Sequence, residues 1–458
     1  MNGPGYHITF DSGTIVVRVP DDEHEKATAL LPQFVWDGRI HAFRASALYY
    51  RKLLITLTRN HVPFLDEAKK YEEIPLQFQF TRVPFYYQSE ALDAWEKNGN
   101  SGVVVLPTGA GKSYVAQLAM ARKCRPTLVI TPTLDLVAQW HFNLERAFGI
   151  HCGIIGGGTY DLQPVTVTTY DSAYIHADHI GNQFGLLIYD EVHHLPTQTY
   201  ALSAQHSIAP YRLGLTATPE RDAPMSYAQL VGPIVYEQTI RALAGENLAL
   251  YETVQYEVEL DEAERVRYDE YRACYLEFIR ANKIRLGTPD GWTDFLRLSS
   301  RSTQGRAALH AHRAQREITQ HCRAKMKLLT ELLAQHRHDR TIIFTADNDT
   351  VYRISREYLI PAITHHSPVK ERRSILEGFN SGVYPVVVTS KVLNEGVDIP
   401  AANVAIVLSG SGSVREHVQR LGRILRAAKD KTAILYELVA KDTSEAFTSE
   451  RRRKHDAF

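Results

Sequence analysis

The part of the sequence that most constrains the fold is an apolar run, Gly102 to Leu106, followed by a glycine-containing turn and a helical pattern from Ser113 to Ala121. A strand that feeds such a turn and opens a helix leaves backbone N–H groups facing outward, where they can hold phosphate oxygens. We call the segment from Leu106 to Ser113, Leu-Pro-Thr-Gly-Ala-Gly-Lys-Ser, the phosphate loop. Lys112 is expected to reach the β- and γ-phosphates of a nucleotide, and the Ser113 hydroxyl to complete a Mg²⁺ shell. The strict pattern has glycine at the position of Leu106, so an ordinary glycine-rich turn is the alternative.

Two adjacent acids follow a second buried-strand pattern. The run Leu186 to Tyr189 is apolar and ends in Asp190 and Glu191. Ligands collect at the carboxyl ends of parallel strands, so we expect Asp190 to hold the Mg²⁺ shell and Glu191 to polarise the attacking water. His193 follows and is expected to sense the γ-phosphate or the neighbouring strands. A solvated acidic turn is the alternative.

A basic helical pattern near the C-terminus covers residues 414–428. Gln419, Arg423 and Arg426 share one face of it, whereas Arg420 points away. The planar arginine fork stays charged and can stabilise the spread charge of a transferring phosphoryl group. We predict this role for Arg423 and Arg426; the alternative is a basic surface helix.

Composition limits the class of protein. The 458 residues suffice for about three or four domains, and 44% hydrophobic content can fill several cores. The formal net charge is zero, so any contact with nucleic acid must come from local patches. The four cysteines lie far apart without a CxxC pair, which is typical of reduced thiols and argues against a zinc or iron–sulfur site. No apolar run approaches the about 18 residues of a membrane span, and we expect a cytoplasmic protein without membrane association.

Two series of short apolar runs alternate with helical patterns, which is typical of parallel sheets covered by helices. The runs are 102–106, 127–131, 165–169, 186–189 and 212–215 in the first series, and 341–344, 386–389, 404–408 and 433–438 in the second. The predicted fold class is α/β, with two RecA-like doubly wound parallel-sheet domains, a helical insertion and a small N-terminal α+β domain. The expected boundaries are 1–75 for the N-terminal domain, 76–250 for the first RecA-like domain, 251–325 for the insertion and 326–458 for the second RecA-like domain.

The expected insertion is helical and strongly charged. Its aromatic residues Tyr268, Tyr271, Tyr275 and Phe278 recur at helical spacing and are expected to form core rather than a base-stacking platform. Eight basic residues face the single acid Glu317 over positions 297–327: Arg297, Arg301, Arg306, Arg313, Arg316, Arg323, Lys325 and Lys327. A track for a phosphate backbone is slightly favoured over a solvated helix face.

The N-terminal segment begins with alternating residues from Ile8 to Val19, which indicate a hairpin, and continues into a helical pattern from Ala45 to Thr58. These residues suggest a small α+β domain, and they assign no chemistry to it.

The order of these motifs resembles that of superfamily 2 helicases, and the residues resemble the XPB family, especially its archaeal and bacterial members. Tyr87-Gln88-Ser-Glu-Ala91 is similar to an adenine-reading motif, in which Gln88 would bond the base edge through both amide groups. Further segments resemble two strand-contact motifs, a motif that couples hydrolysis to movement, and a motif that touches nucleic acid and nucleotide: Thr131–Leu134, Thr168–Tyr170, Leu215–Thr218 and Thr389–Asp398. Where family members have Arg-Glu-Asp after the coupling motif, this chain has Glu220-Arg221-Asp222.

This resemblance implies an ATP-dependent DNA helicase or translocase that moves 3′ to 5′ and acts in DNA repair, with ATP and Mg²⁺ as cofactors. It also implies a partner DNA that is single-stranded, forked or duplex, and a nuclease partner as in archaeal relatives. The insertion resembles the family's thumb-like element and the N-terminal domain its damage-recognition domain. Three alternatives stay open: a nucleotide-gated duplex-binding switch that recruits a nuclease without processive unwinding, a translocating subunit of a defence system, and RNA as the substrate.

Together, the patterns and the resemblance predict the following site residues. The catalytic residues are Lys112, Asp190, Glu191, Arg423 and Arg426. The nucleotide-binding residues are Gln88, Thr108, Gly109, Gly111, Lys112, Ser113, Gly396 and Asp398, with Ser113 and Asp190 at the metal. The nucleic-acid contacts are Thr133, Thr169, Arg221, Arg313, Arg316, Thr389 and Asn394.

Overall fold

The computed structural model describes residues 5–80, 82–219, 227–243, 250–286, 288, 290–390, 402–409 and 432–453. The described residues divide into two compact units, the first up to Leu243 and the second from Leu250 onward. Within the described part of the chain, no helix is both long and apolar enough to cross a membrane.

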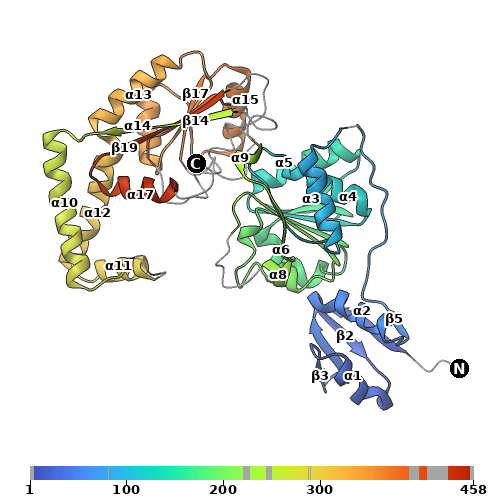
Figure 1. The fold of residues 1–458 in the computed structure, drawn as a ribbon. Helices are drawn as coiled ribbons and strands as arrows, with labels where there is room; N and C mark the ends of the chain where they lie inside the picture. The colour runs from blue at the N-terminus through green and yellow to red at the C-terminus, as the bar shows by residue number, and fades with distance from the viewer. Residues whose placement is uncertain are drawn as a thin grey trace. The chain divides into compact units, whose positions relative to one another are not determined.

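The N-terminal domain is a mixed five-stranded sheet in the order β3-β4-β2-β1-β5, with short helices packed on it (Figure 1). Its elements are β1 (Tyr6–Asp11), β2 (Thr14–Arg18), η1 (Asp21–Glu23), α1 (His24–Leu30), β3 (Val35–Asp37), β4 (Ala42–Ser46), η2 (Ala47–Tyr49), α2 (Tyr50–Arg59) and β5 (Phe64–Asp66). The hairpin predicted from Ile8 to Val19 is confirmed, because β1 and β2 pair antiparallel. The helix expected from Ala45 begins later, because Ala45 pairs with Ile15 in β4.

The first sheet domain contains an eight-stranded sheet in the order β13-β6-β12-β11-β7-β10-β8-β9, in which β9 alone runs antiparallel to its neighbour. Its strands are β6 (Ser101–Val105), β7 (Thr127–Thr131), β8 (Gly153–Gly156), β9 (Thr159–Tyr160), β10 (Val165–Thr169), β11 (Leu186–Asp190), β12 (Tyr211–Thr216) and β13 (Ile234–Glu237). Its helices are α3 (Tyr86–Lys97), α4 (Lys112–Lys123), α5 (Leu134–Phe148), α6 (Tyr170–Ile180), η3 (Val192–His194), α7 (Leu202–Gln205), α8 (Tyr227–Leu230) and α9 (Ile240–Leu243). The five strands predicted in this block are present, and the central ones are buried on both faces, as parallel strands under helices require.

The second sheet domain contains a parallel six-stranded sheet in the order β14-β19-β18-β15-β17-β16. Its elements are β14 (Leu250–Val258), α13 (Arg323–Gln335), β15 (Thr341–Phe344), α14 (Asn348–Tyr358), β16 (Ala362–Ile363), α15 (Val369–Ser381), β17 (Val386–Thr389), β18 (Val404–Val407), β19 (Thr432–Ala440) and α17 (Ser444–Arg453). The structure differs from the expected boundary at residue 251. All nine residues of β14 pair with β19, so this strand belongs to the second sheet rather than to the helical insertion.

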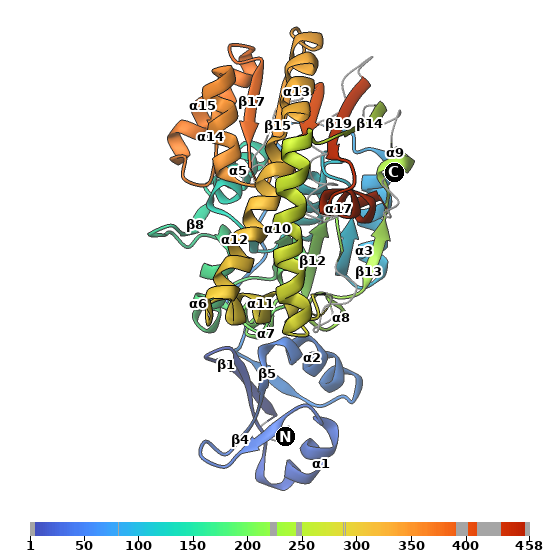
Figure 2. The same cartoon turned by 90° about the vertical axis from the view of Figure 1, so that its left-hand side faces the viewer.

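The helical insertion consists of α10 (Glu262–Ala281), α11 (Gly291–Ser299) and α12 (Thr303–His321). Helices α10 and α12 run antiparallel side by side, with α11 at the far end of the pair (Figures 1 and 2). Tyr275 and Phe278 pack with Phe295 in a hydrophobic cluster between these helices, and Tyr268 is fully buried near the second sheet. The prediction that the aromatic stripe forms core is therefore confirmed.

The basic stretch of the insertion is less cationic than its composition suggested. Lys325 is fully buried, and its Nζ donates to Glu445 Oε2 at 2.7 Å and to the Leu408 carbonyl at 2.8 Å. Arg297 pairs with Asp294, and Arg323 with Asp261. Counting Lys325 in a phosphate track was wrong, because it holds α13 against the end of β18 and against Glu445 of α17 instead.

Because the Lys325–Glu445 pair is buried, breaking it should cost much more stability than breaking an exposed ion pair of the same domain. Glu445→Gln should destabilise the second sheet domain by about 3–5 kcal/mol, because it leaves a buried ammonium without its counter-charge. Glu377→Gln, which breaks the exposed Arg373–Glu377 pair of the same domain, should cost about 0–1 kcal/mol. Native-state hydrogen exchange of the β18 and β19 amides measures both effects. Equal protection in the two variants would contradict the buried role.

Candidate active site

Three predicted motifs meet at one edge of the first sheet. The phosphate loop follows β6, Asp190 ends β11, and the segment Thr216–Thr218 begins at the last residue of β12. Strand β12 lies between β6 and β11 in the sheet, and all three strands run parallel. Their carboxyl ends therefore bring the loop, the acids and the threonines together, as expected for a ligand site in this architecture.

The phosphate loop has the backbone of an anion cradle. Gly109 and Gly111 adopt φ values of 87° and 80°, which L side chains rarely adopt, and Gly111 precedes the first residue of α4. A Cβ at Gly111 would lie 2.5 Å from Gln88 Nε2, so the loop approaches α3 too closely for a side chain.

Polar groups at the loop are also arranged to receive an anion. Lys112 is 9% exposed, and its Nζ makes a long 3.4 Å bond to the Leu106 carbonyl. Thr108 Oγ1 is buried and has no hydrogen-bond partner among the described residues. A weakly held ammonium, an unpartnered hydroxyl and a glycine-lined helix start fit the phosphates of a nucleotide.

Asp190 is a buried carboxylate held by its surroundings. Trp140, on α5, donates its indole N–H to Asp190 Oδ2 at 2.7 Å, and the Glu191 amide donates to Oδ1 at 3.1 Å. The Tyr170 hydroxyl donates to the Asp190 carbonyl at 3.0 Å. Burial raises the pKa of Asp190 to about 6, with the neighbouring Glu191 charge acting in the same direction, while the Trp140 bond and Lys112 oppose the shift.

Glu191 and His193 connect the acid pair to β12. Glu191 has a left-handed backbone with φ of 48°, and its Oε2 lies 3.5 Å from His193 Nδ1. The same Nδ1 lies 3.0 Å from Thr216 Oγ1, which in turn accepts the Thr218 N–H at 3.1 Å. A contact between His193 and a neighbouring strand is thus present, and it joins the second acid to the expected coupling motif.

Gln88 uses both ends of its amide within the protein. Its Oε1 accepts the Phe85 N–H at 3.0 Å, and its Nε2 donates to the Ala110 carbonyl at 2.9 Å. The Tyr87 hydroxyl donates to the same carbonyl at 3.0 Å. With 1% exposure, Gln88 must exchange these bonds before it can read a base edge, and its expected adenine-reading role stays a prediction.

The threonines expected to contact nucleic acid have structural roles here. Thr133 and Thr169 are the N-caps of α5 and α6 and accept from Leu136 N and Ser172 N. Thr389 is fully buried, and its hydroxyl donates to the Ser390 carbonyl at 3.4 Å. Arg313 and Arg316 are exposed on α12.

Several predicted residues lie outside the part of the chain that the structure describes. They are Arg221 with its neighbours Glu220 and Asp222, Asn394, Gly396, Asp398, Gln419, Arg420, Arg423 and Arg426.

Trp140 and Tyr170 both bond to Asp190, a role that the sequence patterns did not reveal; the sequence identifies Tyr170 only as the last residue of a segment that resembles a strand-contact motif. Each lies on a helix that follows a strand, and the sequence pattern of such a helix predicts that an aromatic residue belongs to the hydrophobic core. The available signal was that a buried tryptophan or tyrosine needs a partner for its N–H or O–H group.

Family models match three parts of the chain. Residues 8–68 match the Xeroderma pigmentosum group B helicase damage recognition domain, residues 82–221 the res subunit of type III restriction enzymes, and residues 324–428 the helicase conserved C-terminal domain. The DNA 3′-5′ translocase XPB2 of Sulfurisphaera tokodaii is 40% identical over 429 residues, which cover 93% of this chain and 97% of that protein. The chain belongs to the XPB family of superfamily 2 helicases. The XPB-family resemblance and the two helicase-type domains predicted from the motifs are confirmed.

More distant relatives support the same assignment. The DNA 3′-5′ helicase XPB of Kineococcus radiotolerans is 30% identical over 381 residues, covering 78% of this chain and 60% of that protein. Among solved structures, the Hef helicase domain of Pyrococcus furiosus superposes with a TM-score of 0.54 at 18% identity, covering 81% of this chain and 98% of that one. At this identity the match shows the fold alone.

The bond to Asp190 predicts a pH-dependent phenotype for Trp140→Phe. Loss of a hydrogen bond to a buried charge costs about 1.5–3 kcal/mol, so kcat/KM for ATP should fall about ten-fold or more. Because the Trp140 bond lowers the Asp190 pKa, its loss raises that pKa, and the acidic limb of the profile should move to higher pH.

Trp95→Phe is the matched control. Trp95 is equally buried in the same domain and donates its indole N–H to the Arg212 carbonyl at 2.9 Å, away from the acids. This variant should leave the acidic limb in place. If both variants moved the limb alike, the Trp140 bond would have no specific part in holding the Asp190 charge.

Proposed function

We propose that this chain is an ATP-driven DNA helicase or translocase that moves 3′ to 5′ and opens or remodels duplex DNA in repair. The observation that carries the proposal is the meeting of the phosphate loop, Asp190 and Glu191 at the carboxyl edge of one sheet. Family membership supports it, since XPB relatives are named DNA 3′-5′ translocases and helicases.

The residues of the site suggest a division of work. Lys112 exchanges its weak bond to the Leu106 carbonyl for the β- and γ-phosphates, and Thr108 and the glycine amides hold the same group. Asp190 keeps Oδ2 on Trp140 and accepts the Glu191 N–H with Oδ1, and together with the Ser113 hydroxyl it would hold a Mg²⁺ ion. A bound Mg²⁺ ion would supply charge neutralisation on the phosphates.

Glu191 is the proposed base, because it directly follows Asp190, the proposed metal ligand. Its Oε2 is buried, and among the described residues its ion-pair partner is His193. His193 and Thr216 connect this base to β12. A change at the phosphates thereby reaches the segment Thr216–Thr218, the expected coupling motif. Arg313 and Arg316 are proposed contacts for a nucleic-acid strand.

Glu191→Gln tests the proposed base. The amide keeps the size of the side chain but cannot take a proton, so the variant should bind Mg·ATP with near-normal affinity and hydrolyse it about 10²-fold or more slowly. Nucleotide binding by fluorescence and steady-state ATPase measure the two halves of the prediction. Normal turnover would remove Glu191 from this role.

A second test concerns the predicted finger arginines near the C-terminus, whose helical spacing places Arg426 and Arg420 on different faces. Removing a finger arginine from such an enzyme costs about 10³- to 10⁵-fold in turnover, so Arg426→Ala should lose hydrolysis far more than binding. Arg420→Ala is the control on the same predicted helix, on a different face. Equal rates for the two variants would contradict the finger assignment.

The nucleic-acid substrate is tested by ATPase rates with single-stranded, duplex and forked DNA and with RNA. DNA should stimulate hydrolysis above the RNA level, and equal rates with all four nucleic acids would reject the proposal.

A strand-displacement assay and a triplex-displacement assay then separate the modes of action. Unwinding supports a helicase, triplex displacement alone supports a duplex translocase, and neither supports the nucleotide-gated switch. Co-purification with a nuclease would test the partner expected from the resemblance.

A further inference from the structure

The N-terminal domain is joined to the first sheet domain by a built interface within the first unit. Ser46 Oγ donates to the Gln205 carbonyl at 2.5 Å, and Asn182 Nδ2 donates to the Ala68 carbonyl at 2.9 Å. Ile208 of the first sheet domain is buried in the hydrophobic cluster of the N-terminal domain. The two domains therefore share part of one hydrophobic core, and the hydrogen bonds across the interface fix the residues that line any cavity between them.

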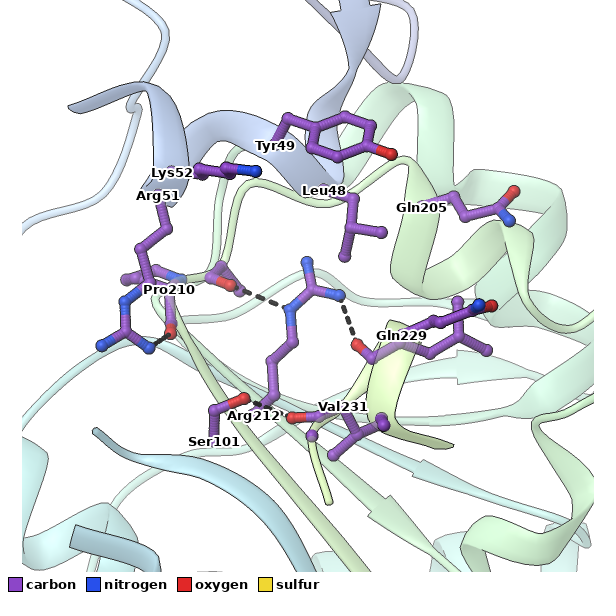
Figure 3. Close-up of a pocket in the computed structure, with 14 residues that line it drawn as sticks. Leu48, Tyr49, Arg51, Lys52, Ser101, Gln205, Pro210, Arg212, Gln229 and Val231 are labelled. Carbon is purple, nitrogen blue, oxygen red and sulfur yellow. Dashed lines mark hydrogen bonds between the residues drawn. The ribbon is translucent and has the colours of Figure 1, made fainter. Parts of the chain in front are cut away.

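One such space is a cavity of about 550 Å³. One wall comes from η2 and α2 of the N-terminal domain, and the other from the start of β12, the start of β6 and the segment 228–232 of the first sheet domain (Figure 3). The cavity lies at the opposite end of β12 from Thr216, so it is distinct from the candidate active site.

The described lining of the cavity carries three cations and no carboxylate. The cations are Arg51 and Lys52 on α2 and Arg212 on β12, and within the described residues none of the three forms an ion pair. Neutral polar side chains, Ser101, Gln205 and Gln229, complete the polar part of the wall. The described part of the lining thus has an excess of positive charge in a protein whose formal net charge is zero.

Arg212 is the most constrained of these cations. It is 6% exposed, and its guanidinium donates to the carbonyls of Ala209, Leu230 and Ser207 at 3.1, 2.7 and 2.8 Å. Burial lowers its pKa to about 10, with the nearby Arg51 charge contributing, so it stays charged at neutral pH. Three of its five N–H donors are used in this way, which fixes the plane of the group and leaves two donors.

Arg51 is fixed from the other wall. Its Nη1 donates to the Pro210 carbonyl at 3.2 Å, two residues before Arg212. Lys52, the next residue of α2, is exposed. Figure 3 shows the Arg212 guanidinium between the two walls and the Arg51 guanidinium turned toward Pro210.

We propose that this cavity binds a phosphate group, with Arg51, Lys52 and Arg212 as its ligands from two domains. The charged side chains of the described lining are all cations, and two N–H donors of the Arg212 guanidinium are not used by its three carbonyl partners. Guanidinium forks match phosphate oxygens in geometry, and a lysine adds a point charge. The phosphate comes either from a free polyphosphate or nucleotide, or from the backbone of DNA. In both cases the ligand bridges the domains and stabilises their contact.

Two paired variants test the site in the full chain. Arg51→Gln/Lys52→Gln removes two of the ligands without touching the buried Arg212. Lys26→Gln/Arg59→Gln removes the same charge from exposed positions of the same domain outside the cavity. As a second test, Gln229→Glu places a carboxylate in the lining, and Gln229→Asn is its neutral control.

The first measurement is calorimetric titration of pyrophosphate, with Mg²⁺ in excess and the phosphate loop saturated with a non-hydrolysable ATP analogue. The second is the salt dependence of duplex DNA binding. A free-phosphate ligand predicts pyrophosphate binding that weakens about ten-fold or more in Arg51→Gln/Lys52→Gln and Gln229→Glu, and in neither control.

A DNA ligand predicts no pyrophosphate binding, but a slope of log K against log salt that is smaller by about 1 to 2 in the cavity variants. If pyrophosphate affinity and salt slope were the same in the cavity variants as in their controls, the site would not exist. The result does not depend on catalysis, so it is separable from a failure of the proposed ATPase.

Discussion

The hydrogen bond from Trp140 to Asp190 allows the first sheet domain to bury a carboxylate at the end of β11. Burial and Glu191 favour the protonated acid, and the indole N–H and Lys112 favour the charged form. The balance leaves a pKa of about 6, so the group is charged at neutral pH but has little surrounding water. The neighbouring charges act on this carboxylate directly, because Lys112 stabilises its charged form and Glu191 opposes it.

The parts of this arrangement that the sequence predicts are local. Apolar runs predict the buried parallel strands, glycines in the phosphate loop predict a backbone that L side chains rarely adopt, and two acids after Tyr189 predict the ligand edge. Each signal lies within about ten residues. Sheet order then follows from general rules of parallel α/β folds, which is why the fold class and the meeting of the motifs were predictable.

The parts that the sequence does not predict depend on distant partners. The expected insertion began too early because the polar residues of β14 hid an outer strand that pairs along its whole length with β19, far away in the chain. The sequence pattern predicts Lys325 to be one of a row of surface cations, but its partner Glu445 lies 120 residues further along the chain. Trp140 read as core, although its N–H group holds the Asp190 charge. In each case composition gives the residue type, and only the fold gives the partner.

A crystal structure of the full chain with Mg²⁺ and a non-hydrolysable ATP analogue tests the central claim most directly. In this complex we expect Asp190 Oδ2 to remain within about 3 Å of Trp140 Nε1, Asp190 Oδ1 and Ser113 to lie at the metal, and Lys112 to leave the Leu106 carbonyl for the phosphates. A nucleotide bound away from the phosphate loop, or a metal held without Asp190, would contradict it.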